Sequence, residues 1–420
     1  MRSVTFIHAA DLHLGAPFKG LRAVSAQWAD TMLAAIPAAF NRIIDVALDH
    51  QVDFMVIAGD VFDDTRPSYA DFSLFVSGME RLNEAGIPVY FINGNHDPYT
   101  SWNNDFAMLP SNTHLLGVDG PGFACFERDG QPLALIGGRS YFNQAWPAGV
   151  DVSDGISRET ATSHLGKQAP FMIGVLHTGL DIDPTRSPAR PADLLARDVD
   201  YWACGHIHQG RLLPSEECPV ISFAGSPQGR GTWETGRHGI LEVTLEEGAP
   251  NKARFISTAQ VEWQRLWVDV SSCRTVADVQ REVVSAQFAA NADSACQRMV
   301  FRIILQGRTP LYSSFTPRVL EDLRTAINDS YPFFFIDAIA NEASAPRDKE
   351  ALRNEGLFPA AFLGAVSAFA ADASRSVSSV ESEFTARGLA VPKGLASVLG
   401  SASGEAEELV LDLLCEEASR

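Results

Sequence analysis

The sequence predicts an α/β protein in which helices cover the faces of a β-sheet. Through the first 240 residues, short apolar runs alternate with amphipathic stretches. From about Val261 a second, shorter alternation of strand and helix patterns begins, and beyond Ala345 the chain becomes rich in Ala and Ser and loses its strand patterns. We therefore expect an α/β domain, then a small α+β domain, then a helical tail.

Five apolar runs of the first domain are interpreted as buried strands, and each is followed within a few residues by Asp, Asn or His. Between them, Gln27–Asp49 and Ser68–Ala85 are predicted to be helices. Ser68 is a suitable N-cap for the second helix, and Gly86 is a suitable stop. The five predicted strands are Val4–Ala9, Phe54–Ala58, Val89–Ile92, Phe171–Leu176 and Tyr201–Cys204.

A hairpin is predicted to close the first domain, because alternating residues at Gly239–Leu245 and Ala253–Thr258 flank a turn-prone segment. The pattern then predicts, in order, a strand, a helix, a strand, a helix and a strand at Leu266–Val270, Val276–Phe288, Met299–Leu305, Pro317–Ile327 and Phe333–Ile336. In the tail, Phe358–Ala371 and Glu405–Leu414 are the clearest amphipathic helices. These patterns predict a domain at 1–260, an α+β capping domain at 261–345, and a helical C-terminal region for partner docking at 346–420.

Composition limits the classes of function. No apolar run approaches the roughly 20 residues needed to span a bilayer, and the first residues turn polar at Asp11 before a secretory segment can form. Six cysteines are scattered without a CxxC pair, which is typical of reduced thiols. We expect a cytoplasmic protein that does not engage a membrane. The formal charge of −19 opposes the large basic face of an autonomous nucleic-acid binder.

Side chains that bind metals recur in five short motifs, one after each predicted strand. In open α/β folds the carboxyl ends of the strands converge on one crevice, so these residues can line a single cavity. Taken alone, each is more often a turn or capping residue than a ligand, but their recurrence after five strands favours a shared site. The candidate ligands are Asp11, His13, Asp60, Asn95, His177, His206 and His208.

This donor set predicts a pair of divalent cations. Imidazole, carboxylate and amide ligands suit Mn, Fe or Zn, and the lack of thiols opposes a structural zinc site. Two ions about 3.5–4 Å apart can bridge a hydroxide and hold a phosphate oxygen for in-line attack on phosphorus. Asp60 is expected to offer one oxygen to each ion. His96 is expected to act as a general acid or electrostatic stabiliser, oriented by Asp97. His8, inside the first strand, is expected to be a satisfied core histidine.

At these residues the sequence resembles the calcineurin-like metallophosphoesterase superfamily. The ordered motifs of that superfamily, DxH, GDxxD, GNH(D/E), H and GHxH, are all intact within residues 1–240. The resemblance implies a β-sandwich flanked by helices and two metal ions that share one carboxylate. It implies Asp11, His13, Asp60 and His208 as ligands of one ion. It implies Asp60, Asn95, His177 and His206 as ligands of the other.

Within the superfamily the resemblance is closest to SbcD-type DNA repair exonucleases, particularly their YhaO-like branch. It is carried by HAADLHLG at 8–15 and GSPQGRG at 225–231. It implies DNA as substrate, Mn²⁺, a homodimer, and an SMC-like coiled-coil ATPase partner docked through C-terminal helices. Members of the nuclease family often carry His three residues after the bridging Asp, where this chain has Asp63. Asp63 could instead hydrogen-bond a ligand histidine.

The leading functional hypothesis is therefore an Mn-dependent DNA phosphodiesterase, an exonuclease or endonuclease, within a DNA repair nuclease–ATPase complex. Two alternatives stay open: a phosphoesterase for a small molecule or a phosphoprotein, and a mainly structural subunit of the ATPase complex. Arg139 and Arg230 lie in glycine-rich surroundings and are candidate substrate contacts.

Overall fold

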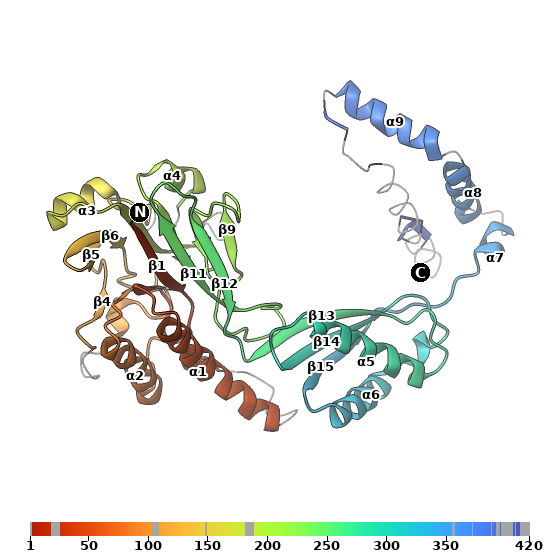
Figure 1. Ribbon diagram of the computed structural model, residues 1–420. Coiled ribbons are helices and arrows are strands. Elements are labelled where there is room, and N and C mark those ends of the chain that lie inside the picture. The colour runs from red at the N-terminus through yellow and green to blue at the C-terminus, as the bar shows by residue number, and fades with distance from the viewer. Residues whose placement is uncertain are drawn as a thin grey trace. The chain divides into compact units, whose positions relative to one another are not determined.

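In the computed structural model, the chain folds into two compact units, and each is described by itself (Figure 1). The first unit comprises Met1–Gly307 and Leu311–Ala343, and the second comprises Arg308–Pro310 and Ser344–Arg420. The structure describes residues 2–17, 26–102, 109–147, 149–180, 189–354, 358–371, 373–387, 389–391, 395, 406–407 and 409–411.

The first unit is built on two six-stranded sheets. In the first sheet, β1 (Ser3–Ala9) runs parallel to β2 (Phe54–Ala58) and antiparallel to β11 (Gly239–Glu246). The strand order of this sheet is β12-β11-β1-β2-β3-β4, and β2, β3 and β4 are parallel. The remaining strands are β3 (Val89–Ile92), β4 (Thr113–Leu115) and β12 (Lys252–Ser257).

The second sheet has the order β5-β6-β7-β8-β10-β9. Its four central strands β6, β7, β8 and β10 are parallel, and the edge strands β5 and β9 are antiparallel to their neighbours. The strands span Gly122–Arg128 (β5), Gln131–Gly138 (β6), Phe171–His177 (β7), Tyr201–Gly205 (β8), Arg211–Leu213 (β9) and Ile221–Phe223 (β10).

The two sheets pack face to face over a shared apolar core. Phe6 of β1 stacks on Phe54 of β2 with ring centroids 4.8 Å apart, and it meets the edge of Tyr201 of β8 at 5.6 Å. All three side chains are buried. Aromatic pairs in this geometry add to the stabilisation from apolar burial. The predicted α/β sandwich is thus confirmed, with strands from both halves of the first unit contributing to one core.

Helices cover the outer faces of both sheets (Figure 1). Helices α1 (Ala26–Asp49) and α2 (Tyr69–Glu84) bury Phe40 and Phe75 against the first sheet. Helices α3 (Arg158–Leu165) and α4 (Pro191–Ala196) lie on the second sheet, where the indole N–H of Trp202 donates to the carbonyl of Leu194 at 3.1 Å. The outer faces of both sheets are therefore covered by apolar packing of their own.

Helix α1 is the one described helix that is long and apolar enough, over Trp28–Asp49, to cross a membrane by length and composition. Half of that stretch is buried. Phe40, Ile43 and Ile44 pack in the core beside the first sheet. An amphipathic core helix passes the same test of length and apolarity, so α1 by itself is weak evidence for a membrane span.

The region after β12 forms a three-stranded, fully parallel sheet of β13 (Val261–Asp269), β14 (Arg298–Gln306) and β15 (Phe334–Asn341). Helices α5 (Val276–Ala292) and α6 (Pro317–Ser330) cover one of its faces. The other face packs at its start on α1, where the rings of Trp28 and Phe335 lie 5.4 Å apart. The sandwich and the predicted capping domain therefore form one packed unit.

The described part of the second unit contains three helices. It contains α7 (Lys349–Asn354), α8 (Phe358–Ala371) and α9 (Ala373–Ala386). The ammonium of Lys349 lies 2.7 Å from the carboxylate of Glu407. The predicted helix at Glu405–Leu414 falls largely outside the described residues, although the described parts at 406–407 and 409–411 are helical.

The five predicted strands and two predicted helices of the first domain are confirmed to within one residue at each end. The Ser68 hydroxyl caps α2 by accepting from the backbone N–H of Asp71 at 3.2 Å, and Gly86 follows with φ +72°. The sequence patterns missed β4, β5, β6, β9 and β10. Three of these are only three residues long and β5 is half-buried, so neither length nor alternation marks these four strands. The strand β6 is eight residues long and mostly buried, and its apolar run Leu133–Ile136 was the signal that the patterns missed.

His8 joins the two sheets, as a satisfied core histidine. The ring is fully buried, with Nε2 3.2 Å from the carbonyl of Cys204 and Nδ1 3.0 Å from the Tyr201 hydroxyl. Because the carbonyl can only accept, Nε2 carries the proton of the neutral ring and Nδ1 accepts from the hydroxyl. Burial lowers the pKa of His8 to about 3, although the bond to Cys204 opposes the change.

This burial predicts a loss of stability in acid. The unfolded chain binds a proton at His8 below pH ~6.5, whereas the folded chain does not until about pH 3. The neutral His8 therefore makes its full contribution to the free energy of unfolding above pH ~6.5. Below that pH, this contribution falls by about 1.4 kcal/mol per pH unit. Urea unfolding at pH 7.5 and pH 5 should show the wild type losing about 2 kcal/mol more than His8→Gln. Equal losses in the two proteins would contradict this assignment.

Candidate metal centre

The five loops with the predicted ligands meet at one end of the sandwich. Three loops follow β1, β2 and β3 of the first sheet, and two follow β7 and β8 of the second. The backbones of the first two loops are hydrogen-bonded to each other: Asp11 N–H donates to Gly59 O at 3.1 Å and His13 N–H donates to Asp60 O at 3.0 Å. The backbone N–H of His206, after β8, donates to Asp11 Oδ1 at 3.0 Å, so loops from both sheets meet at one place.

The backbone is strained at the ligands. Seven described residues other than glycine have positive φ, and four of them are Asp11, His13, Asp60 and His206. Each such residue costs free energy that the surrounding structure must offset, and such residues cluster at functional sites.

Close approach of the loops requires glycine beside the ligands. A Cβ on Gly94 would lie 2.0 Å from Asp60 Oδ1, and a Cβ on Gly205 would lie 2.0 Å from Ala58 O. Both contacts are far inside van der Waals distance, so no other residue fits at these positions without movement of the loops.

Asp60 lies between two groups of donor atoms. Its Oδ1 accepts the backbone N–H of His96 at 2.9 Å. Its Oδ2 lies 3.3 Å from His177 Nε2 and 3.8 Å from His13 Nε2. We expected one carboxylate oxygen to face each ion, but a single oxygen faces both groups, because the other is taken by the backbone.

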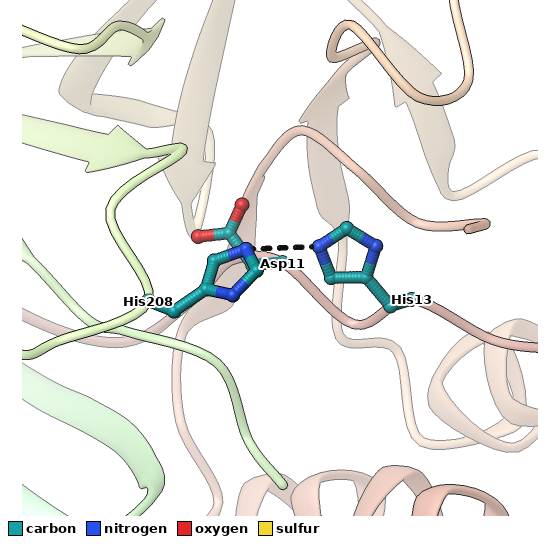
Figure 2. A group of neighbouring side chains, drawn as sticks. All are labelled: Asp11, His13 and His208. Carbon is teal, nitrogen blue, oxygen red and sulfur yellow. Dashed lines mark hydrogen bonds between the residues drawn. The ribbon is translucent and has the colours of Figure 1, made fainter. Parts of the chain in front are cut away.

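The first donor group contains Asp11, His13 and His208, whose donor atoms lie within 4.8 Å of one another. Figure 2 shows Asp11 and His13 on one loop and His208 on another, with the Asp11 carboxylate beside the ring of His208 and the two rings facing each other. The Nε2 atoms of His13 and His208 are 3.1 Å apart. Two ligands bound at about 2.1 Å and at right angles would be about 3.0 Å apart, so this spacing suits one divalent cation.

The second donor group gathers around Asn95. Its Oδ1 lies 3.1 Å from His177 Nε2 and 3.1 Å from His206 Nδ1. With Asp60 Oδ2 beside His177, these atoms include each ligand type expected for the second ion. The two groups share Asp60, which is the arrangement that a two-metal site requires.

Acceptors around the cluster hold three of the imidazoles, those of His13, His177 and His208, with Nε2 facing inward, whereas His206 faces Asn95 through Nδ1. The Nδ1–H of His177 donates to Ala58 O at 2.9 Å, and that of His208 donates to Glu234 Oε1 at 2.7 Å. Nδ1 of His13 lies 2.9 Å from Asp63 Oδ1. An acceptor at Nδ1 selects the tautomer whose Nε2 lone pair is free, and this is the form that binds a metal. The donor set therefore fits divalent cations, and the geometry agrees with the expected contact of Asp63 with a ligand histidine.

Glu234 is a site residue that the sequence patterns did not identify. It is 6% exposed, and it holds His208 from one side and the backbone N–H of Arg230 at 2.8 Å from the other. Burial raises the pKa of its carboxyl, but the hydrogen bond and charge of His208 outweigh burial and hold this pKa at about 2. The feature of the sequence that could have identified Glu234 is its position as an acidic residue in a loop that contains Gly and Trp.

The two arginines proposed as substrate contacts lie in different surroundings. Arg230 bonds Asp63 Oδ1 at 2.6 Å and Glu234 Oε1 at 3.3 Å, so it joins the two carboxylates that hold His13 and His208. The guanidinium of Arg139 lies 5.1 Å from the ring centroid of Trp146. Arg230 is thus tied into the surroundings of the ligands rather than free to meet substrate.

Asp97 is buried and supports the loops instead of orienting His96. It accepts from the backbone N–H groups of Gly94 at 2.9 Å and Val61 at 3.0 Å. Burial, with the nearby charge of Asp60, raises the pKa of Asp97 above its usual range. The ring of His96 is oriented by Asp63, whose carbonyl oxygen lies 2.8 Å from Nδ1.

His96 lies at the mouth of the cluster. Its side chain is 42% exposed, whereas the candidate ligands His13 and His177 are buried. The carbonyl of Asp63 can only accept, so Nδ1 of His96 donates and Nε2 is left to gain or lose a proton. This placement suits a group that exchanges a proton with a substrate.

Residues 4–210 match the calcineurin-like phosphoesterase family, and residues 263–343 match the middle domain of metallophosphoesterase YhaO. The chain is similar to the uncharacterized metallophosphoesterase YhaO of Bacillus subtilis, with 30% identity over 359 residues, 82% of this chain and 84% of that protein.

A second group of relatives consists of proteins described as the DNA double-strand break repair protein Mre11. The Thermoplasma acidophilum protein is 26% identical over 238 residues, 54% of this chain and 58% of its own length. The Methanopyrus kandleri protein is 32% identical over 318 residues, 67% of this chain and 62% of its own length. The chain thus spans somewhat more than half the length of these relatives.

Glu234 provides a test of the metal centre. We expect Glu234→Gln to weaken Mn²⁺ binding by roughly 10- to 100-fold, because His208 loses the carboxylate that fixes its tautomer. Isothermal titration with Mn²⁺ measures the change. Glu262→Gln is the matched control, since Glu262 is also buried but bonds Gln264 and Ser294 in the region after β12. If both variants bound Mn²⁺ like the wild type, Glu234 would have no part in a metal site.

Proposed function

Because the chain belongs to the calcineurin-like phosphoesterase family, we propose that it is a metal-dependent DNA phosphodiesterase, an exonuclease or endonuclease that hydrolyses by an in-line, two-metal mechanism. One observation carries this proposal: Asp60 Oδ2 faces two groups of inward-directed metal-binding atoms. DNA as the substrate is supported by the relatives described as DNA double-strand break repair proteins.

We propose ligand roles for seven residues, with Asp60 shared between two Mn²⁺ ions; Fe or Zn would also suit this donor set. Such ions, when bound, supply a nucleophile from water and charge that neutralises the phosphate. One ion would be held by Asp11, His13, Asp60 and His208, and the other by Asp60, Asn95, His177 and His206.

His96 is the proposed catalytic residue outside the ligand set. Its Nε2 delivers a proton to the leaving oxygen, or stabilises the charge that develops there. The Asp63 carbonyl fixes the orientation of the His96 ring, and the backbone N–H of His96 donates to Asp60 Oδ1. These two hydrogen bonds fix the position of the proton donor relative to the bridging carboxylate. Asp63, Glu234 and Arg230 position the ligand histidines.

The assembly in which the enzyme would act is also a proposal. The resemblance to SbcD-type nucleases supports a homodimer with an SMC-like coiled-coil ATPase, docked through the helical region 346–420. A chain with a net charge of −19 gains from a partner that supplies basic surface for DNA. The five cysteines of the described residues are free thiols, which fits a reducing cytoplasmic compartment.

Cleavage of DNA is the direct test. Purified protein with Mn²⁺ should degrade labelled single- or double-stranded DNA, whereas Asp60→Ala should not, because the two donor groups lose their shared ligand. Gel analysis of the products distinguishes removal of end nucleotides from internal cuts. Hydrolysis of bis-p-nitrophenyl phosphate without any cleavage of DNA, alone or with the ATPase, would favour a small-molecule or phosphoprotein phosphoesterase.

His96→Ala separates proton transfer from metal binding. We expect its cleavage rate on DNA to fall roughly 10²- to 10⁴-fold, the usual contribution of a general acid. Its rate on bis-p-nitrophenyl phosphate should fall far less, because p-nitrophenolate leaves without a proton. Mn²⁺ affinity should stay unchanged by titration. An equal loss on both substrates would argue against the general-acid role, leaving charge stabilisation.

A further inference from the structure

Two exposed tryptophans line a groove beside the loop that carries Glu234. The groove has a volume of about 500 Å³ and is lined mainly by Trp233, Trp267, Arg265, Thr232, Thr235 and Gln264. Trp233 is 72% exposed and Trp267 is 57% exposed. Single exposed aromatic side chains are common, but here two of them line one cavity.

The local structure holds these side chains in place. Arg265 and Trp267 are two residues apart on β13, so they share one face of the strand. The ring of Trp233 lies against Gly231, where an added Cβ would be 2.4 Å from the ring. The backbone N–H of Gly236 donates to Trp263 O at 2.9 Å, which joins the loop to β13.

Arg265 supplies a positive charge to the groove. Its Nε donates to Thr232 O at 3.0 Å. Within the described part of the chain, no hydrogen bond or ion pair is recorded for its terminal nitrogens. No acidic side chain is among the residues that line the groove, although the chain carries a net charge of −19. The groove therefore offers flat aromatic faces and a guanidinium able to bind a phosphate.

The groove and the candidate metal centre share one loop of the chain. Trp233 precedes Glu234, whose carboxylate lies 2.7 Å from Nδ1 of the candidate ligand His208. The loop that holds the candidate ligand His208 therefore also supplies part of the groove lining. The threonines and glutamine between the rings make the lining polar, unlike the continuous apolar patch typical of a protein interface.

We propose that this groove binds unpaired nucleotides of a single-stranded DNA substrate, an inference that rests on the proposed function. Bases stack on Trp233 and Trp267, and Arg265 contacts the phosphate backbone. Aromatic stacking accepts any base, because every base has a π-face, so the groove would confer a preference for unpaired over duplex DNA without sequence specificity.

Binding to a hydrolysis-resistant probe tests the proposal apart from catalysis. The full-length protein with Mn²⁺ is titrated against fluorescein-labelled phosphorothioate oligothymidylate by anisotropy. Trp233→Ala and Trp267→Ala should each weaken binding by roughly tenfold, the usual scale for loss of one stacked base. Trp233→Phe and Trp267→Phe should retain most of the affinity. Phe333→Ala, which removes another exposed aromatic ring at 65% exposure, should leave binding unchanged.

The salt dependence tests the contact with phosphate. Arg265→Gln should reduce the slope of log affinity against log salt by about 0.7, the value for one phosphate contact on a single strand. Arg265→Lys should restore it, because lysine keeps the charge. A slope that does not change in Arg265→Gln would remove this residue from the proposed contact.

The outcomes separate this inference from the proposed function. If the alanine variants of both tryptophans bound the oligonucleotide like the wild type, the inference would be overturned even if the protein cut DNA. If they also shifted a dimer to monomer in sedimentation, the groove would instead be an interface between copies. Tryptophan-dependent binding without any cleavage would support the groove and overturn the nuclease. Hydrolysis of bis-p-nitrophenyl phosphate should stay unchanged in all these variants.

Discussion

The carboxylate of Asp60 is the constraint on which the rest of the site depends. One of its oxygens is occupied by the backbone N–H of His96, so the other faces both donor groups. A buried carboxylate is costly unless it is paired, and here neighbouring imidazoles hold the pKa of Asp60 low against the effect of burial. Two cations bound at this oxygen would likewise supply the positive charge that a buried carboxylate needs, and the same cations could take part in hydrolysis.

The sandwich makes this arrangement possible because its two sheets end at the same place. Loops from the first sheet supply Asp60 and Asn95, and loops from the second supply His177 and His206. The strained backbone of these loops costs free energy, which the aromatic and aliphatic core beneath them offsets. Asp97 stabilises the loops by accepting hydrogen bonds from backbone N–H groups of two loops at once. Rigid strands therefore support irregular loops, which is how precise sites are usually built.

A network of charges surrounds the ligands and links parts of the chain that are distant in sequence. Arg230 joins Asp63 to Glu234, and these two carboxylates hold His13 and His208. The family nucleases often carry histidine where this chain has Asp63, and here that carboxylate has a definite partner on each side. The loop that contains Arg230 and Glu234 continues into the tryptophan-lined groove, so ligand positioning and the proposed binding of substrate share one segment.

The sequence by itself determined five strands of the sandwich and the candidate ligands that follow them, because burial makes long apolar runs and metal chemistry restricts the residues that can serve as ligands. Only the tertiary structure decided which polar groups surround those ligands. Glu234 lies 26 residues from His208 in sequence, and no periodicity predicts their contact. The same holds for Asp97, which binds backbone instead of its neighbour His96, and for short edge strands such as β9. Local patterns record what a residue buries, whereas its partners depend on how distant loops meet.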